Sequence, residues 1–452
     1  MHKSNIKMQK FSCIALACII AGVLCSAPPA LGETVQEAVV ATLKTNPDVL
    51  IDVARRLSTG EALKGARGGY LPRVDLTISN SSETPDTSTI RLNYGVSPIS
   101  QHRYDRSLTL SQMLFDGFAT SGEVNRNLAR TESAAHKLAY TSEQTALKAI
   151  ESYLEVLRLQ EALRLTENNL AAHQRTLDQI KLRSASGVGR KADQDQIEAR
   201  VALANSNLLA AEANLKVAEI NYQLVVGNMP KALVNPTIPD PTLIPASPEE
   251  AVKMAIANNR IIKSAKADIE AASAQHQAAK SPMYPRLDFE MGATRNDTAN
   301  RFENIKDTNE YALLKMRFNL FSGRSNQASI AETGYLLDEA RETMHRAERQ
   351  LEQSARLSWT AHRSSEDRLP SLAQHAESSL LTRDAYAKQF TMGQRTLLDL
   401  LDTENELFTS TIDYINGRYV ELFSDYRVLA DIGILLDVLG IPHREEAMLS
   451  PP

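Results

Sequence analysis

Two stretches of this 452-residue chain alternate apolar and polar residues with a period of two. In the first, single polar residues separate Val74, Leu76 and Ile78, and a similar alternation follows Pro285 in the second half. This period is typical of strands that have one apolar face. The pattern therefore predicts two β-hairpins, at about 72–115 and 285–321. Their strands are expected at about 72–84 and 103–115 in the first, and at about 285–293 and 310–321 in the second.

Long helical segments follow both hairpins. After Asp116 the chain runs for about 70 residues without a proline, and a matching segment after Ser322 is interrupted by Pro370. We predict long helices at about 116–186 and 322–392, each roughly 105 Å long at about 1.5 Å per residue. Asp116 and Ser322 are suitable N-caps, and Pro370 predicts a kink or local break.

A shorter helix is predicted to return beside each long one, at about 193–226 and 399–432. Apolar residues in both recur at spacings of three and four, the heptad pattern of a coiled coil. In the first they are Ile197, Val201, Ala204, Leu208, Ala211, Leu215, Ala218, Tyr222 and Val225. Only one face of each helix is strongly apolar, so we expect the opposite face to meet water.

The two halves of the chain are copies of each other. Phe115 and Phe321 head the two long segments, 206 residues apart, whereas equivalent residues before the hairpins are 213 apart. The second copy therefore lacks seven residues, which a loop at a hairpin tip loses most cheaply. The predicted parts are repeat 1 (33–227), a proline-rich linker (228–246), repeat 2 (247–441) and a loose tail (442–452).

The first 32 residues have the pattern of a secretory signal peptide. A basic start precedes an apolar stretch from Phe11 to Cys25, and Ala30 to Gly32 offers small residues for cleavage. All three cysteines lie in this segment, and Leu24 before Cys25 is unfavourable for lipidation. No later segment has 18 consecutive apolar residues, so we expect no transmembrane helix in an exported protein.

Charge and motif spacing argue against nucleic-acid binding and catalysis. The net charge is -5, and removing the three lysines of the signal leaves -8, which disfavours nucleic acid. The nine histidines form no His-Glu-x-x-His motif or other ligand spacing, so no metal, cofactor or enzyme activity is predicted. Gly187-x-Gly189 lacks the strand–helix context of a nucleotide loop and is interpreted as a helix-hairpin turn.

Four strands with one apolar face cannot sit in a membrane as an open sheet, because the edge strands leave backbone groups without hydrogen bonds. The sheet must close with copies of itself. Two, three or four chains would supply eight, twelve or sixteen strands, with the apolar side toward lipid and the polar side toward the lumen. The long helices would extend from one rim as a helical tube.

From Thr34 to Gly440 the chain resembles the TolC family of outer-membrane channel proteins. The most specific piece is the segment from Gly393 to Asp402, Gly-Gln-Arg-Thr-Leu-Leu-Asp-Leu-Leu-Asp, together with the duplicated Leu-Phe-(Asp/Ser)-Gly before each long helix. The resemblance implies a mainly α fold with a small β part. It also implies a homotrimer whose twelve-stranded β-barrel lies in outer-membrane lipid and is continued by an α-helical barrel in the periplasm. The implied partners are a periplasmic adaptor and an inner-membrane ABC or RND transporter, and the missing lipidation site favours the type I secretion branch.

The resemblance also implies a gate where the helix hairpins turn, at Gly187, Gly189 and Gly393. Arg395 resembles the arginine that locks neighbouring helices, and Asp193 resembles its carboxylate-side partner. This chain has Phe390 where the family has a tyrosine, so the tyrosine's hydrogen bond to Asp193 is missing from the expected lock.

Asp399 and Asp402 resemble inward-facing acidic rings at the tunnel entrance. Because they are three residues apart, they share one helix face, and three chains would place six carboxylates around one axis. The alternative is that they are exposed acids favourably placed in the first turn of a helix. Arg395 could likewise be an ordinary surface charge.

The favoured hypothesis is a passive exit duct for secreted protein, small toxic compounds or both, opened when a transporter–adaptor assembly engages the tip. A secreted structural coiled-coil protein without a pore is the alternative, which explains the heptads but not the paired hairpins. An enzyme such as a barrel hydrolase is a third hypothesis, for which no nucleophile–base constellation is present.

Overall fold

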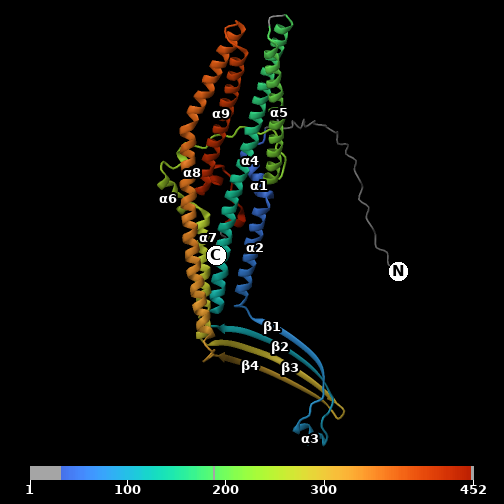
Figure 1. Ribbon diagram of the computed structural model, residues 1–452. Coiled ribbons are helices and arrows are strands. Elements are labelled where there is room, and N and C mark those ends of the chain that lie inside the picture. The colour runs from blue at the N-terminus through green and yellow to red at the C-terminus, as the bar shows by residue number, and fades with distance from the viewer. Residues whose placement is uncertain (1–31, 187–188, 449–452) are drawn as a thin grey trace, which may run out of the picture.

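The computed structural model describes residues 32–186 and 189–448. Long helices stand on one end of a four-stranded sheet, and two helix hairpins end at the opposite end of the molecule (Figure 1). The first repeat contains α1 (Val35–Thr45), α2 (Pro47–Gly68), β1 (Arg73–Glu83), α3 (Ser88–Tyr94), β2 (Gln101–Phe115), α4 (Ala119–Ala185) and α5 (Lys191–Val226). The second contains α6 (Pro248–Asn258), α7 (Arg260–Ala278), β3 (Arg286–Asn300), β4 (Asn304–Arg317), α8 (Ser325–Thr391), α9 (Leu397–Asp431) and α10 (Leu435–Val438). The mainly α fold with a small sheet is confirmed.

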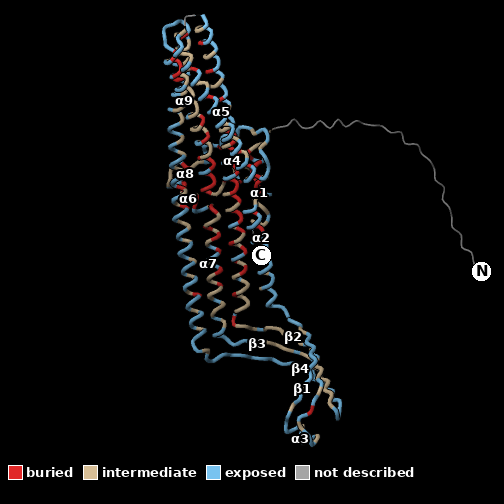
Figure 2. Tube along the Cα trace, turned by 45° about the vertical axis from the view of Figure 1, so that its right-hand side comes forward, coloured by how far each residue is buried: buried red, intermediate tan, exposed pale blue. Residues whose placement is uncertain are grey.

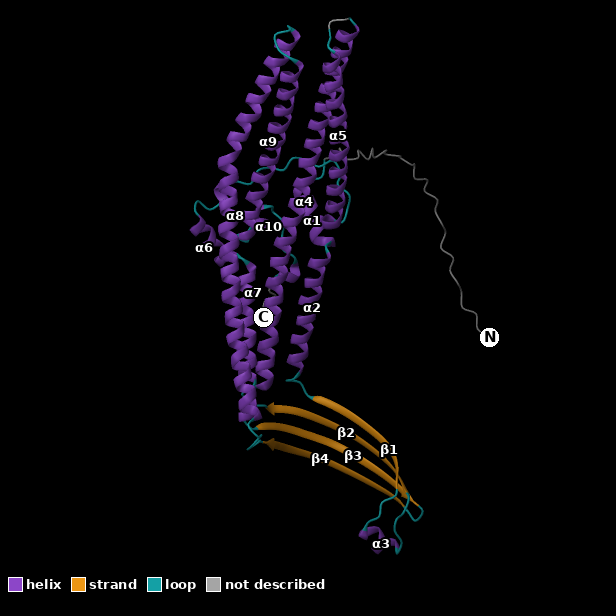
Figure 3. Cartoon of the chain, viewed as in Figure 1, coloured by secondary structure: helices purple, strands orange, loops and turns teal. Residues whose placement is uncertain are grey.

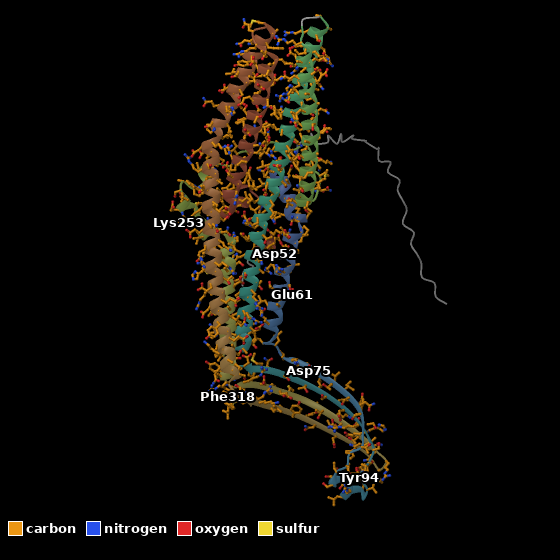
Figure 4. All side chains as sticks on the ribbon, in the orientation of Figure 1. Asp52, Glu61, Asp75, Tyr94, Lys253 and Phe318 are labelled. Carbon is orange, nitrogen blue, oxygen red and sulfur yellow. The ribbon has the colours of Figure 1, made fainter. Side chains whose placement is uncertain are left out.

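The strands pair in the order β1-β2-β3-β4, all antiparallel, so the two hairpins form one sheet (Figure 3). One cross-strand row joins Val74, Leu110, Met291 and Ala312. Because side chains alternate across a sheet, this row shares one face with every second row, such as that of Leu76 and Leu108, and these rows form an apolar face. The opposite face carries polar residues such as Asp75, which Figure 4 labels on β1.

The second hairpin differs from its predicted outline. Its strands were expected to end near 293 and to resume near 310, but they run to Asn300 and restart at Asn304. The residues beyond the apolar rows are polar on both faces, so the period of two fades there although the backbone ladder continues. The first hairpin instead has a long connection that contains α3, which the sequence did not predict.

Both long helices begin three residues later than the predicted N-caps, at Ala119 and Ser325. Phe118 and Arg324 precede them with left-handed φ angles of 70° and 69°, each after a glycine that is also left-handed. This double reversal turns the chain from strand into helix. Asp116 still serves the helix start, because its Oδ2 accepts the backbone N–H of Thr120 at 2.8 Å.

The predicted kink or break at Pro370 does not end α8, which runs continuously past the proline. The flanking Leu369 and Leu372 face Gly417 on α9, where an added Cβ would lie 2.6 Å from Leu372 Cδ1. The missing side chain at Gly417 lets the two helices pack closely here. This packing supports α8 where the proline removes a backbone hydrogen bond.

The helices form a wall with two open edges. In the tip half, α8 packs on α9, α9 on α4 and α4 on α5; near the sheet, α7 lies between α8 and α4, and α2 covers the other side of α4. Figure 1 shows the same order from left to right. One edge of the protomer therefore consists of α5, α2 and β1, and the other of α8, with α6 packed on its outer side, and β4.

The expectation that α5 has a single apolar face is wrong. Its predicted seam does pack inward, with Ile197, Ala204 and Tyr222 fully buried. A second heptad series lies on another face and includes the apolar residues Leu203, Ala210, Ala213, Val217, Ile220 and Leu224. Its large members are 53% to 79% exposed in the protomer. We call this series the outer stripe of α5.

The largest apolar core lies midway along the rods, where α1, α6 and α10 surround the long helices (Figure 2). Tyr153 of α4 is fully buried, and its hydroxyl accepts the N–H of Val234 at 3.0 Å. This contact fixes the start of the proline-rich linker against the core.

The C-terminal segment, expected to be loose after 441, packs against this core as far as residue 448. Arg444 Nη1 donates to the carbonyl oxygen of Leu43 at 2.9 Å. Glu143 of α4 is 2% exposed and accepts the N–H of Leu436 at 3.3 Å. Burial raises the pKa of Glu143 from an ordinary value of 4.5 to about 7.

Replacing Glu143 with glutamine is expected to flatten the pH dependence of unfolding. Because the pKa of Glu143 is raised in the folded state, its protonated form stabilises the fold. This stabilisation is complete below pH 4.5 and is lost as the pH rises through about 7. The wild type should lose about 3 kcal/mol of unfolding free energy between these limits. Denaturant unfolding followed by circular dichroism at pH 5 and pH 8 measures this loss. Glu151→Gln, an exposed site on α4, should behave as wild type, and an unchanged slope in Glu143→Gln would contradict the assignment.

Candidate functional site at the helix tips

Both helix hairpins turn at the end of the molecule farthest from the sheet (Figure 1). Gly393 has a φ of 74°, a conformation that favours glycine. Gly189 is needed for a different reason, because a Cβ there would lie 2.7 Å from the backbone N of Ser184. Gly187, the remaining predicted turn residue, lies outside the described residues.

Phe390 joins the two hairpins through an apolar cluster. The side chain is 6% exposed and packs with Ile180 of α4, Ile197 of α5 and three leucines of α9, which are Leu397, Leu400 and Leu401. The guanidinium carbon of Arg183 on α4 lies 4.9 Å from the centroid of its ring. At this position a tyrosine hydroxyl would have to find a polar partner in an apolar site, whereas phenylalanine needs none.

Arg395 is held within its own hairpin. Its Nε donates to Gln389 Oε1 at 3.1 Å, and its guanidinium carbon lies 4.2 Å from the ring centroid of Tyr386. In the described part of one protomer, no hydrogen bond or ion pair reaches the carboxylate of Asp193. The structure of a single protomer therefore does not bring Arg395 and Asp193 together.

The sequence analysis missed Tyr386 as a partner of Arg395. Tyr386 lies one helical turn before Phe390, and this spacing of four places both aromatic rings near the tip of α8. From this spacing, the sequence could have predicted that Tyr386 lies near Arg395.

Asp399 caps the start of α9. Its Oδ2 accepts the backbone N–H of Thr396 at 3.0 Å and the Thr396 hydroxyl at 2.8 Å, and Thr396 Oγ1 accepts the N–H of Asp399 at 3.2 Å. Hydrogen bonds from the backbone and side chain of Thr396 lower the pKa of Asp399, which keeps this carboxylate ionised. The sequence Thr-x-x-Asp could have predicted this capping box.

Asp402 is the freer of the two acids. Its side chain is 63% exposed, and the nearest cation is Arg200 Nη2 on α5, 3.8 Å from Asp402 Oδ1. At this distance and exposure the pairing is weak. The tip therefore presents two carboxylates three residues apart, one engaged in capping and one open to solvent.

Within residues 32–186 and 189–448, histidines, cysteines and acids form no group that could hold a metal ion. Over the same residues, no helix combines the length and apolarity that crossing a membrane requires.

Phe390→Ala is expected to loosen the tip. Removing a buried aromatic side chain leaves a cavity between the two hairpins and should lower local stability by about 3 kcal/mol. Hydrogen exchange of the backbone amides around Gly393, measured by mass spectrometry, reports this loss as faster exchange. Leu398→Ala is the matched control, because Leu398 is 49% exposed and lies on the turn of α9 whose leucines contact Phe390. Equal effects of the two variants would show that the cluster does not stabilise the tip.

The comparisons with known proteins agree with this architecture. A family model described as outer membrane efflux protein matches residues 38–228 and 251–421. The outer membrane efflux protein BepC of Brucella suis is 24% identical over 432 residues, covering 95% of this chain and 91% of BepC. The outer membrane protein TolC of Vibrio cholerae is 24% identical over 411 residues, covering 87% and 89% of the two chains.

Among solved structures, the CmeC outer membrane channel of Campylobacter jejuni superposes with a TM-score of 0.76 at 11% sequence identity. The match covers 89% of this chain and 86% of CmeC, and it shows that the two share a fold. The family model spans most of the chain, and its members are channel proteins of the outer membrane. The chain therefore belongs to the outer membrane efflux protein family, as a TolC-type channel protein of the outer membrane and not an enzyme.

Proposed function

We propose that three copies of this chain form the exit duct of a tripartite export system. The observation that carries the proposal is the pair of open edges on the protomer wall. Among the described residues, β1 and β4 each pair on one side only. Joining one edge to the opposite edge of the next copy is a head-to-tail contact that closes into a ring. Three copies give a closed sheet of twelve strands.

The two faces of the sheet suit a membrane wall. The row of Val74, Leu110 and Met291 would face lipid, and the polar face would line a water-filled lumen. Aromatic residues lie at both ends of the sheet, as membrane interfaces favour. Figure 4 labels Phe318 at the helix end and Tyr94 at the loop end, where Tyr94 stacks on Phe302 with ring centroids 5.0 Å apart.

The helix tips would form the gate of this duct. We place Arg395 opposite Asp193 of a neighbouring copy, a contact that one protomer cannot make. Six carboxylates from Asp399 and Asp402 of the three copies would surround the entrance and attract cations. Opening would separate the α8–α9 hairpin from its neighbours and break the contacts of Arg395.

A periplasmic adaptor and an inner-membrane ABC or RND transporter would engage this tip and supply the energy. The duct itself would conduct passively, carrying secreted protein, small toxic compounds or both to the exterior. A polar lumen face and a charged entrance would suit hydrated substrates.

Single-channel conductance in planar bilayers tests the duct and the acidic entrance together. The wild type should show a cation-selective conductance that an added trivalent cation blocks. The double variant Asp399→Asn/Asp402→Asn should be much less sensitive to the block, because it removes all six charges. Asparagine at 399 retains a side-chain oxygen that can accept the Thr396 N–H, so the capping of α9 is least disturbed.

Asp338→Asn on the exposed face of α8 is the control and should be blocked as the wild type is. A pore that is blocked equally in wild type and double variant would retain the duct but refute the acidic ring. Folded, membrane-inserted oligomers without conductance would favour the structural coiled-coil protein.

The outer stripe of α5 tests the assembly of copies. Ile220→Glu places a charge in the proposed contact and should cost about 3 kcal/mol or more per interface. Native mass spectrometry of the detergent-solubilised protein should then show monomers in place of trimers, with helical content unchanged. Gln223→Glu is the matched control on the charged face of α5. Ile220→Glu trimers as abundant as those of the wild type would refute this interface.

A further inference from the structure

A cavity of about 590 Å³ lies beneath the proline-rich linker, midway along the rods and far from the tips. The linker forms its roof with prolines and Ile238, and α8 and α9 form its floor. Two hydrogen bonds hold this roof in place. Trp359 Nε1 on α8 donates to the carbonyl oxygen of Pro245 at 2.8 Å, and the Tyr426 hydroxyl on α9 donates to that of Thr237 at 3.1 Å.

The floor gathers charged side chains from both helices. Trp359, His362 and Glu366 recur at spacings of three and four, so they share one face of α8. Glu421 and Asp425 are four apart and share the facing side of α9. All five line the cavity.

Most of these charges already have partners. His362 Nδ1 lies 2.7 Å from Asp425 Oδ1, and Arg363 Nη1 lies 2.7 Å from Glu366 Oε2. Arg418, the remaining cation of the lining, pairs with Glu161 of α4.

Glu421 is the exception. Within the part of the chain that the structure describes, no hydrogen bond or ion pair reaches its carboxylate, although the residue is only partly exposed. Burial raises the pKa of Glu421, and the charges of Asp425 and Glu366 raise it further, while His362 opposes them. The lining has three acidic and three basic side chains, and the other charges are paired, so the unpaired carboxylate of Glu421 in this partly enclosed cavity attracts a cation.

The rest of the lining sets the kind of cation. Trp359, Pro236, Pro239 and Ile238 offer aromatic and aliphatic surface rather than the set of oxygen ligands that a metal ion requires. An aromatic face and a carboxylate together bind ammonium groups well. We propose that this cavity is a binding site for a small hydrophobic organic cation. Its charged nitrogen pairs with Glu421, and its apolar body lies between Trp359 and the linker prolines.

Trp359 is the only tryptophan in the chain, so it reports binding directly. The experiment titrates the purified full-length protein in a non-ionic detergent with 3-phenylpropyl-trimethylammonium and follows tryptophan fluorescence excited at a wavelength the ligand does not absorb. A saturable change is expected with this cation. The neutral 3-phenylpropanol and the anionic 4-phenylbutanoate should bind about tenfold more weakly or not at all, because they lack the charge-assisted contact.

Glu421→Gln should weaken binding of the cation by about tenfold, since it removes one charged contact and keeps the side-chain shape. Glu421→Asp keeps the charge and should bind measurably better than the glutamine variant. Glu339→Gln, an exposed site on α8 outside the cavity, is the matched control and should bind as the wild type does. Circular dichroism confirms that each variant is folded.

Three results would overturn the proposal: no saturable signal with the cation, equal binding of the three ligands, or an affinity that Glu421→Gln leaves unchanged. Because the readout is fluorescence of Trp359, failure here is distinguishable from failure of the proposed duct, which conductance tests.

Discussion

The backbone groups at the sheet edges impose the constraint on which the rest of the structure depends. A strand in a membrane must satisfy its N–H and C=O groups within the protein. Among the residues that the structure describes in one copy, β1 and β4 leave half of theirs without strand partners. The helical wall repeats the same incompleteness, because α5 exposes its outer stripe along the edge that continues from β1. One assembly step can therefore satisfy both the sheet and the rods.

Duplication explains why such a wall closes evenly. Each repeat supplies one hairpin and one helix pair, and both long helices contain 67 residues. The two tips consequently end at the same level, as the proposed gate requires. At the tips, Phe390 and Arg395 have no equivalents of the same type in the first repeat, where Ser184 and Gly189 stand at the matching positions.

At the tip, single side chains serve both stability and the proposed function. Asp399 stabilises the start of α9 through Thr396 and also contributes charge at the proposed entrance. Phe390 binds the two hairpins of one copy together by apolar contact, while Arg395 stays near the surface. In the proposed gate, the apolar contact of Phe390 lies within one copy, whereas the polar contact of Arg395 would lie between copies.

The sequence alone predicts the two hairpins, the two long helices and the helices that return beside them, because strand and helix periods, caps and turns depend on neighbours within a few residues. It also predicts the mainly α fold and the positions of the acids at the start of α9. It does not predict α3 or the full length of β3 and β4. The left-handed Phe118 before α4, the contact of Arg395 with Tyr386 and the place of Glu421 in a cavity all depend on the folded chain. These contacts depend on packing between distant segments, as when the linker meets Trp359, 114 residues away. Local pattern carries no information on which helix face meets which partner.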